Sequence, residues 1–173
     1  MITSEQEKWL AHLPDGNSIE IHPYDPTSLD KFSLIKQMIK KTLGKGAKIE
    51  LHGAVSFGIS GQGEIDIDIP VSPADFDTTI KKMERAFGKP GSLYPLRRAR
   101  FVIYIKETKA EIIVVNEECA DWTNLLEFEE HLKTHPKALN AYEKIKEAAA
   151  GLSTQKYYRA KTKFINRILA KCK

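Results

Sequence analysis

The sequence predicts an α+β fold in which a small mixed β-sheet is flanked by helices and followed by a helical C-terminal part. Three observations predict it. Short apolar segments of strand length alternate with helical patterns through the first two thirds of the 173-residue chain. The last third shows only the apolar spacing of three to four residues that helices have. No internal repeat or low-complexity linker divides the chain, and this order of elements is typical of the α+β class.

Composition indicates the class of protein. Hydrophobic residues make up 42% of the chain, which is enough for a globular core. No run approaches the roughly 20 consecutive apolar residues of a membrane span, and the polar N-terminal segment lacks the features of a secretory signal. The cysteines at 119 and 172 have no metal-binding spacing. We expect one cytoplasmic domain over residues 1–173, with an N-terminal extension at 1–17, a helical C-terminal part at 120–173, and no membrane partner.

The N-terminal part predicts two helices and one short strand. A capping-box pattern, Ser4 with Glu7, predicts a helix over residues 4–13. Residues 19–22 alternate like a strand. A second helix is expected to open at residues 25–28 and to end before the glycine at 44. Its apolar face would consist of Leu29, Phe32, Ile35, Met38, Ile39 and Leu43.

Two strand-like segments with a glycine-rich stretch between them follow. Residues 48–52 and 64–71 are the predicted strands, and residues 53–63 are the predicted loop. Ser72 is expected to cap a helix that starts at Pro73. The inward-facing residues of that helix would be Phe76, Ile80, Met83 and Phe87.

A hairpin and three helices complete the predicted fold. Residues 101–105 and 111–115 have strand character, and the short polar segment between them predicts a hairpin. Helical spacing then recurs over residues 123–134, 136–149 and 154–171.

The residues that carry chemistry lie on the predicted strand 64–71. Side chains two positions apart on a strand point to one face, so Asp66 and Asp68 point together. Adjacent carboxylates repel unless a cation lies between them, and their oxygens suit Mg²⁺ or Mn²⁺. Such a metal can activate a hydroxyl and neutralise a triphosphate. Glu111, on the last predicted strand, is the expected third ligand and completes the expected catalytic set. The alternative is that this pair is only the solvent face of an edge strand.

The glycine-rich segment would supply contacts to phosphate. Its glycines let backbone N–H groups approach phosphate oxygens closely, although the segment is not a P-loop. Arginine forks and the lysines of the last helix suit phosphate as well, and solvated surface is the alternative for them. The expected nucleotide-binding residues are Gly53, Ala54, Ser56, Gln62, Arg97, Arg98, Arg100, Lys156 and Lys163.

The net charge of +4 is unevenly distributed along the chain. Residues 133–173 contain eleven basic and two acidic residues, a net charge of +9, which leaves −5 for the rest. Such asymmetry is typical of a surface that attracts phosphates or RNA, and a solvated helix surface is the alternative.

Taken in order, these segments resemble the GrpB family within the DNA polymerase β-like nucleotidyltransferase superfamily. Residues 53–68 are similar to the superfamily's Gly-Ser…Asp-x-Asp element. Residues 19–26, 128–136 and 157–165 are similar to the family's opening strand, its Phe-Arg-x-x-Leu-Arg-x-His-Pro stretch and its closing helix. The resemblance covers roughly residues 19–170. It implies a nucleotidyltransferase fold that binds Mg²⁺ and nucleotide at Asp66 and Asp68.

The chain departs from the family pattern in the loop. Ala54 stands where the family has serine, Gln62 where it has lysine, the loop is one residue shorter, and His52 is out of register. A lost cation weakens charge neutralisation in a transition state. We therefore expect either a Mg²⁺-dependent nucleotidyltransferase that moves a nucleoside monophosphate from a triphosphate to a hydroxyl or RNA acceptor, or a catalytically weakened nucleotide- or RNA-binding module. A scaffold protein is the third alternative.

Overall fold

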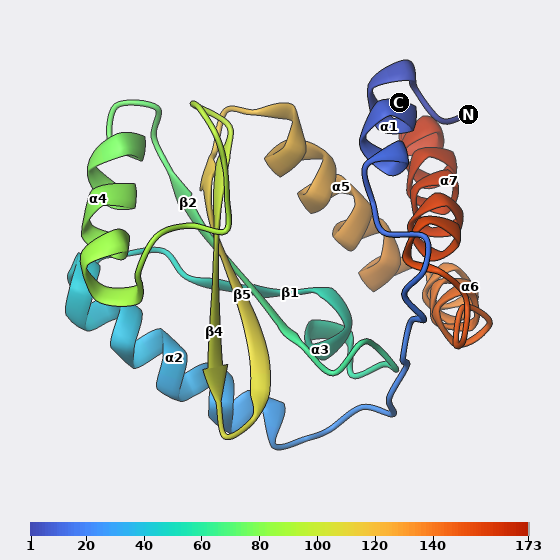
Figure 1. Ribbon diagram of the computed structural model, residues 1–173, viewed down its shortest axis with the longest axis horizontal. Coiled ribbons are helices and arrows are strands. Elements are labelled where there is room, and N and C mark those ends of the chain that lie inside the picture. The colour runs from blue at the N-terminus through green and yellow to red at the C-terminus, as the bar shows by residue number, and fades with distance from the viewer. Residues whose placement is uncertain (173) are drawn as a thin grey trace. The chain divides into compact units, whose positions relative to one another are not determined.

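The computed structural model describes residues 1–172, and their contacts divide into two compact units. The sheet unit comprises residues 24–59 and 63–123. The helical unit comprises residues 1–23, 60–62 and 124 onward. Figure 1 labels the elements of both. The single domain predicted over residues 1–173 stays a prediction.

The sheet unit contains five strands and the helices that pack on them. Its sheet has the order β1-β2-β5-β4-β3, in which β2 and β5 are parallel and the other neighbours are antiparallel. Its elements are α2 (Ser28–Leu43), β1 (Glu50–His52), α3 (Gly53–Phe57), β2 (Ile65–Val71), α4 (Phe76–Phe87), β3 (Ser92–Tyr94), β4 (Arg98–Ile105) and β5 (Thr108–Asn116). The predicted α+β fold class with a mixed sheet is confirmed.

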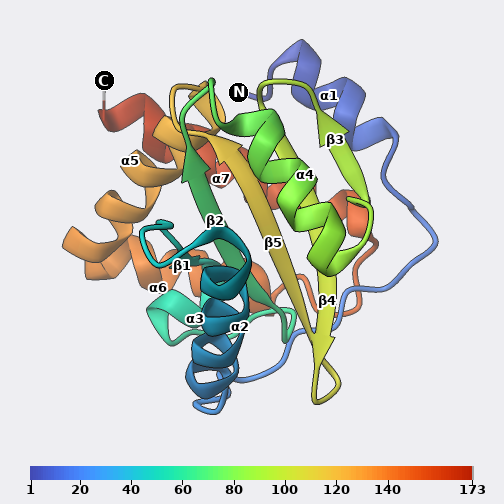
Figure 2. The same cartoon turned by 90° about the vertical axis from the view of Figure 1, so that its left-hand side faces the viewer.

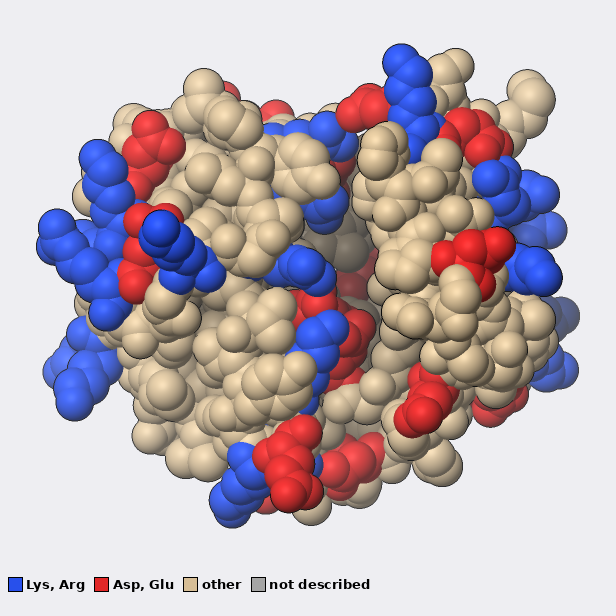
Figure 3. Space-filling view, viewed as in Figure 1, with Lys and Arg blue, Asp and Glu red and all other residues tan. Residues whose placement is uncertain are grey.

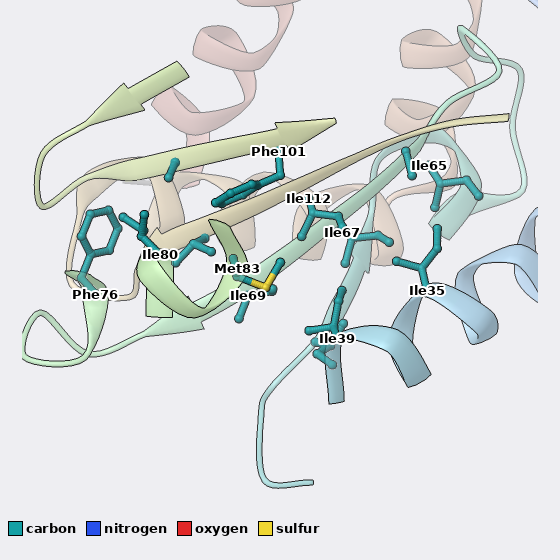
Figure 4. Close-up of a cluster of buried hydrophobic side chains, with 14 of the residues drawn as sticks. Ile35, Ile39, Ile65, Ile67, Ile69, Phe76, Ile80, Met83, Phe101 and Ile112 are labelled. Atoms are coloured by element: carbon teal, nitrogen blue, oxygen red, sulfur yellow. The ribbon is translucent and has the colours of Figure 1, made fainter. Parts of the chain in front are cut away.

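The core of the sheet unit lies between one face of the sheet and two helices. Figure 2 shows α2 and α4 over this face, and Figure 4 shows isoleucines of β2 pointing toward them. Ile67 is 0% exposed, as are Ile39 of α2 and Met83 of α4. Burial of each such side chain contributes about 1.5–3 kcal/mol, so this layer fixes which face of the sheet is covered.

The helical unit is built from four helices, of which α5 starts in the sheet unit. They are α1 (Ser4–Ala11), α5 (Ala120–Thr134), α6 (Pro136–Glu147) and α7 (Thr154–Cys172). Phe128, Tyr142 and Phe164 form an aromatic cluster with ring centroids 5.2–6.3 Å apart. Arg159 of α7 donates two hydrogen bonds, of 2.6 and 2.8 Å, to the Glu7 carboxylate of α1. No described helix is long and apolar enough to cross a membrane.

The structure corrects two predictions in the N-terminal part. The predicted first helix forms, but its capping box is made by Thr3 and Gln6, not by Ser4 and Glu7. Residues 19–22 are not a strand, and Ser18 and His22 make only isolated bridges. The reason is that the backbone of Ile19 bonds to a loop: its N–H donates to Leu152 O, and its carbonyl accepts from Gly151 N–H.

The structure also corrects the glycine-rich loop and the start of α4. Residues 53–57 form the short helix α3, which ends at Gly58 in the left-handed conformation (φ 64°). The helix predicted from Pro73 begins at Phe76, because Ser72 and Asp75 form a tight hydrogen-bonded turn first. Strand β3 was not predicted.

The predicted hairpin forms between β4 and β5. Ile105 pairs with Thr108, so the turn consists of Lys106 and Glu107. Both have positive φ, 45° and 67°, as a two-residue turn that matches the twist of the strands requires. This turn fixes which residues of β4 lie opposite those of β5.

Candidate functional site

The face of the sheet opposite the isoleucines carries a group of charged side chains. Register partners in a sheet point to the same face. Asp66 is paired with His52 of β1 and with Glu111 of β5, and Asp68 is paired with Glu50. The three carboxylates expected as metal ligands therefore share one face. We call this surface the charged face; it comprises Glu50, His52, Asp66, Asp68, Arg98, Arg100, Lys109 and Glu111.

Asp66 lies against the start of α3. Gly53 has φ 70°, and a Cβ atom there would clash with Asp66 Oδ2 and lie 2.9 Å from Asp66 Cγ. Only glycine fits this contact without displacing the carboxylate, because other residues disfavour this φ and need the same space. Gly53 thus has a role in positioning Asp66 that differs from the phosphate contact expected from sequence.

Asp68 is buried beside a histidine. The side chains of Asp68 and His52 are 8% and 6% exposed, and His52 Nε2 lies 3.8 Å from Asp68 Oδ2 and 3.7 Å from Glu50 Oε2. The ring of Trp122 packs edge-on against the imidazole at 5.5 Å. A protonated His52 would offset the charge of Asp68. His52 was not predicted as a site residue, because the antiparallel pairing of β1 with β2 is what brings it here.

Glu111 is held by two cations. Its Oε1 accepts hydrogen bonds from Lys109 Nζ at 2.6 Å and from Arg100 Nη1 at 2.9 Å. Lys109 also donates to Glu64 at 2.8 Å. Burial alone would lower the pKa of Lys109, but the hydrogen bonds to Glu111 and Glu64 outweigh it and raise that pKa above its ordinary value. Lys109 and Glu64 were missed from sequence, although Lys109 lies two positions before Glu111 and so on the same face.

The other expected phosphate ligands of the sheet unit have protein partners. Arg97 forms a fork with the Asp121 carboxylate at 2.7 and 2.9 Å. The Arg98 guanidinium lies over the Tyr94 ring, 5.2 Å from its centroid. Ser56 donates its hydroxyl to Gly53 O at 2.8 Å, and Ala54 is buried. Of these arginines, Arg100 is the one that contacts Glu111.

Three expected nucleotide-binding residues belong to the helical unit. Lys156 and Lys163 are exposed on α7, and Gln62 is half-buried. Tyr157 of the same helix is 1% exposed and packs in the core with Ile19.

Some of the side chains on the charged face are suitable ligands for a hard cation such as Mg²⁺. Asp66 and Asp68 present carboxylate oxygens, which Mg²⁺ prefers. Within residues 1–172, however, no group of three or more His, Cys, Asp or Glu side chains is arranged to hold a metal ion. The ion pairs of Glu111 agree with that finding. A metal at this face would therefore have Asp66 and Asp68 as its protein ligands, and Glu111 stays a predicted third ligand.

Comparison with known proteins first defines the fold. The chain is similar to a solved structure described as "Crystal structure of conserved protein GrpB from Enterococcus faecalis", with a TM-score of 0.67. The two sequences are 20% identical, and the match covers 88% of this chain and 96% of that chain. At this identity the match shows a shared fold.

The family follows from the sequence itself. The family model described as GrpB protein matches residues 18–171. The chain therefore belongs to the GrpB family, which confirms the resemblance drawn over roughly residues 19–170. No curated protein matches the chain. The placement in the nucleotidyltransferase superfamily stays a prediction.

Proposed function

We propose that this GrpB-family protein is a Mg²⁺-dependent nucleotidyltransferase whose reaction centre is the charged face of the sheet. The observation that carries the proposal is the pairing of Asp66 with Glu111 on parallel strands, with Asp68 on the same face and Gly53 in contact with Asp66. In the proposed reaction, the acceptor hydroxyl attacks the α-phosphorus of a nucleoside triphosphate, forming a P–O bond as pyrophosphate leaves.

Each residue of the charged face has a proposed task. Asp66 and Asp68 would hold Mg²⁺, which supplies neutralising charge to the triphosphate and lowers the pKa of the attacking hydroxyl. Glu111 accepts the proton of that hydroxyl once the cations that bind it are drawn to phosphate. Arg100 and Lys109 bring positive charge to the triphosphate, which this chain needs because Gln62 stands where the family has lysine.

The acceptor is proposed to be an RNA or small-molecule hydroxyl. The support for RNA is the +9 net charge of residues 133–173, because such a surface attracts phosphodiesters. Lys156 and Lys163 are exposed on α7 and are the proposed contacts.

The test is a transfer assay with the full chain, α-labelled nucleoside triphosphates, Mg²⁺, and pooled RNA or small hydroxyl acceptors. Label transfer and pyrophosphate release are expected, and Asp68→Asn should lower the rate by about 100-fold or more, because metal-held charge contributes several kcal/mol. Asp77→Asn, an exposed acid on α4, is the matched control. An unchanged rate in Asp68→Asn would refute the proposal.

A second candidate is a nucleotide-binding module without transfer. The ion pairs of Glu111 with Lys109 and Arg100 favour it, because a carboxylate bound by two cations is a poor base. It predicts that a triphosphate with Mg²⁺ raises the free energy of unfolding by about 2.7 kcal/mol at 100 times its Kd, with no pyrophosphate released. Thermal shift and pyrophosphate assays on one sample separate the two candidates.

A further inference from the structure

A cavity of about 360 Å³ lies at the carboxyl ends of the parallel strands β2 and β5. It is lined by the end of α2 and the loop after it, by residues 69–72, by the first turns of α4, and by Glu117 after β5. Asp66, Asp68 and Glu111 are not among its lining residues. The crevice outside the carboxyl ends of strands is where open α/β sheets bind small molecules, and this volume is sufficient for one.

The charged side chains around the cavity are balanced in sign. Two are basic, Lys48 and Lys82, and two are acidic, Asp75 and Glu117. Lys48 and Glu117 are 3.9 Å apart, longer than a hydrogen bond, so each charge retains capacity for another partner. A purely anionic or cationic ligand would face two like charges here. A ligand that carries both signs would not.

Thr79 adds a buried polar group to the wall. Thr79 is 8% exposed and lines the cavity, and its hydroxyl makes no hydrogen bond within the described residues. A hydroxyl can both donate and accept a hydrogen bond, so the Thr79 hydroxyl can bond to a polar atom of a ligand in the cavity. Thr79 and Lys82 are three positions apart on α4 and share a face of that helix.

The remaining wall is apolar and comes from the end of α2, the loop after it and β2. Leu43, Ala47 and Ile69 line it. Such a wall accepts an apolar group but offers no hydrogen-bond partner to a polar side chain.

We propose that this cavity binds a free α-amino acid with an apolar side chain. Lys82 and the Thr79 hydroxyl bind the carboxylate of the amino acid, Asp75 and Glu117 bind its ammonium group, and the apolar wall receives its side chain. This site is separate from the charged face, so it stands whether or not the protein transfers nucleotides.

The test is calorimetric titration of the full chain with the twenty amino acids, followed by matched analogues of the tightest ligand. Saturable binding is expected for a branched or otherwise apolar amino acid. Its decarboxylated amine and its deaminated acid should each bind at least tenfold more weakly. If no amino acid binds, or if an analogue with one charge binds as tightly, the proposal is overturned.

Variants locate the binding in this cavity. Lys82→Met and Glu117→Gln should each weaken binding tenfold or more, whereas Lys81→Met and Glu118→Gln, their exposed sequence neighbours outside the lining, should not change it. Thr79→Val should weaken binding several-fold, and Thr79→Ser should restore it, which separates loss of the hydroxyl from loss of packing. Equal binding by Lys82→Met and Lys81→Met would place the ligand elsewhere. Asp68→Asn should bind the amino acid normally.

Discussion

The two faces of β2 come from one alternating sequence, yet they are held in different ways. On one face Ile65, Ile67 and Ile69 are at most 1% exposed and are covered by α2 and α4. On the other face Asp66 is held by contact with Gly53, and Asp68 lies against a histidine. Apolar packing is summed over many weak contacts, whereas the charged face depends on a few specific atoms. Substitutions on the first should change stability, and those on the second should change chemistry.

The largest expected effect is on the apolar face. Ile67→Ala removes a side chain that is 0% exposed and should lower the free energy of unfolding by about 2–5 kcal/mol, because it leaves a cavity in the core. Urea denaturation measures this change. Val102→Ala, on the charged face and only half-buried, is the comparison, and an equal loss there would remove the distinction between the faces.

The next effect concerns the contact between Gly53 and Asp66. Gly53→Ala should lower stability by about 1–3 kcal/mol, because it strains the positive φ and displaces the carboxylate. Gly58→Ala places a methyl group at a similar positive φ of 64°, where it would make only an ordinary contact with Tyr24 at 3.9 Å. The difference between the two variants in urea denaturation isolates the Asp66 contact. A difference of zero would show that the carboxylate moves aside without cost.

A smaller effect is expected from the Glu111 ion pairs. Lys109→Met should lower stability by about 1 kcal/mol at pH 8, since the ammonium is one third exposed and solvent screens part of the attraction. Because folding raises the pKa of Lys109, this contribution is present below the unfolded pKa of about 10.4 and is lost as pH rises through the folded value. The gap between wild type and variant should therefore persist at pH 8 and shrink above about pH 10.4. A gap that is unchanged at pH 11.5 would contradict this.

The smallest effect is expected at the turn that sets the register of β4 on β5. Replacing Lys106-Glu107 with Asn-Gly should raise stability by about 0.5–1 kcal/mol, because asparagine and glycine adopt positive φ with less strain. Thermal denaturation checks the sign. A loss would indicate that these two side chains contribute more than their backbone conformation costs.

Sequence patterns predicted the parts of the fold that depend on periodicity. The isoleucines of β2 recur every two residues, as on one face of a strand, and the apolar residues of α2 and α4 recur every three to four residues, as on one face of a helix. All three elements are present in the structure. The strand expected at residues 19–22 failed because the chain there bonds to a loop far away in sequence, which periodicity does not encode. The helix α3 was not predicted because it is short and begins with glycine, and short segments that contain glycine and serine are also typical of loops.

The candidate site was predictable only in part, for a related reason. Asp66 and Asp68 share a face by local geometry, and Glu111 could be proposed from strand order. The cations on Glu111 depend on the pairing of β5 with β4 and on side chains crossing between strands, as with Arg100. The Gly53 contact depends on how α3 meets β2. Neither arrangement has a signal within a single stretch of sequence.

Basic side chains also gather away from the charged face. Figure 3 shows Lys and Arg side chains together at the edge of the sheet unit formed by α2 and α4. The exposed basic residues of these two helices include Lys41 of α2 and Lys81, Lys82 and Arg85 of α4. The main excess of positive charge along the chain lies in residues 133–173, so charge counted along the chain does not show every basic surface of the folded protein.

The division of the chain into two units has a practical consequence for dissecting it. The polypeptide crosses between the units four times, and residues 60–62, which belong to the helical unit, interrupt the sheet unit between α3 and β2. Neither unit can therefore be expressed as one contiguous segment of the chain. A protease that cuts once, at any bond, still leaves pieces of both units on at least one product, so the chain must be tested by point substitution and not by truncation.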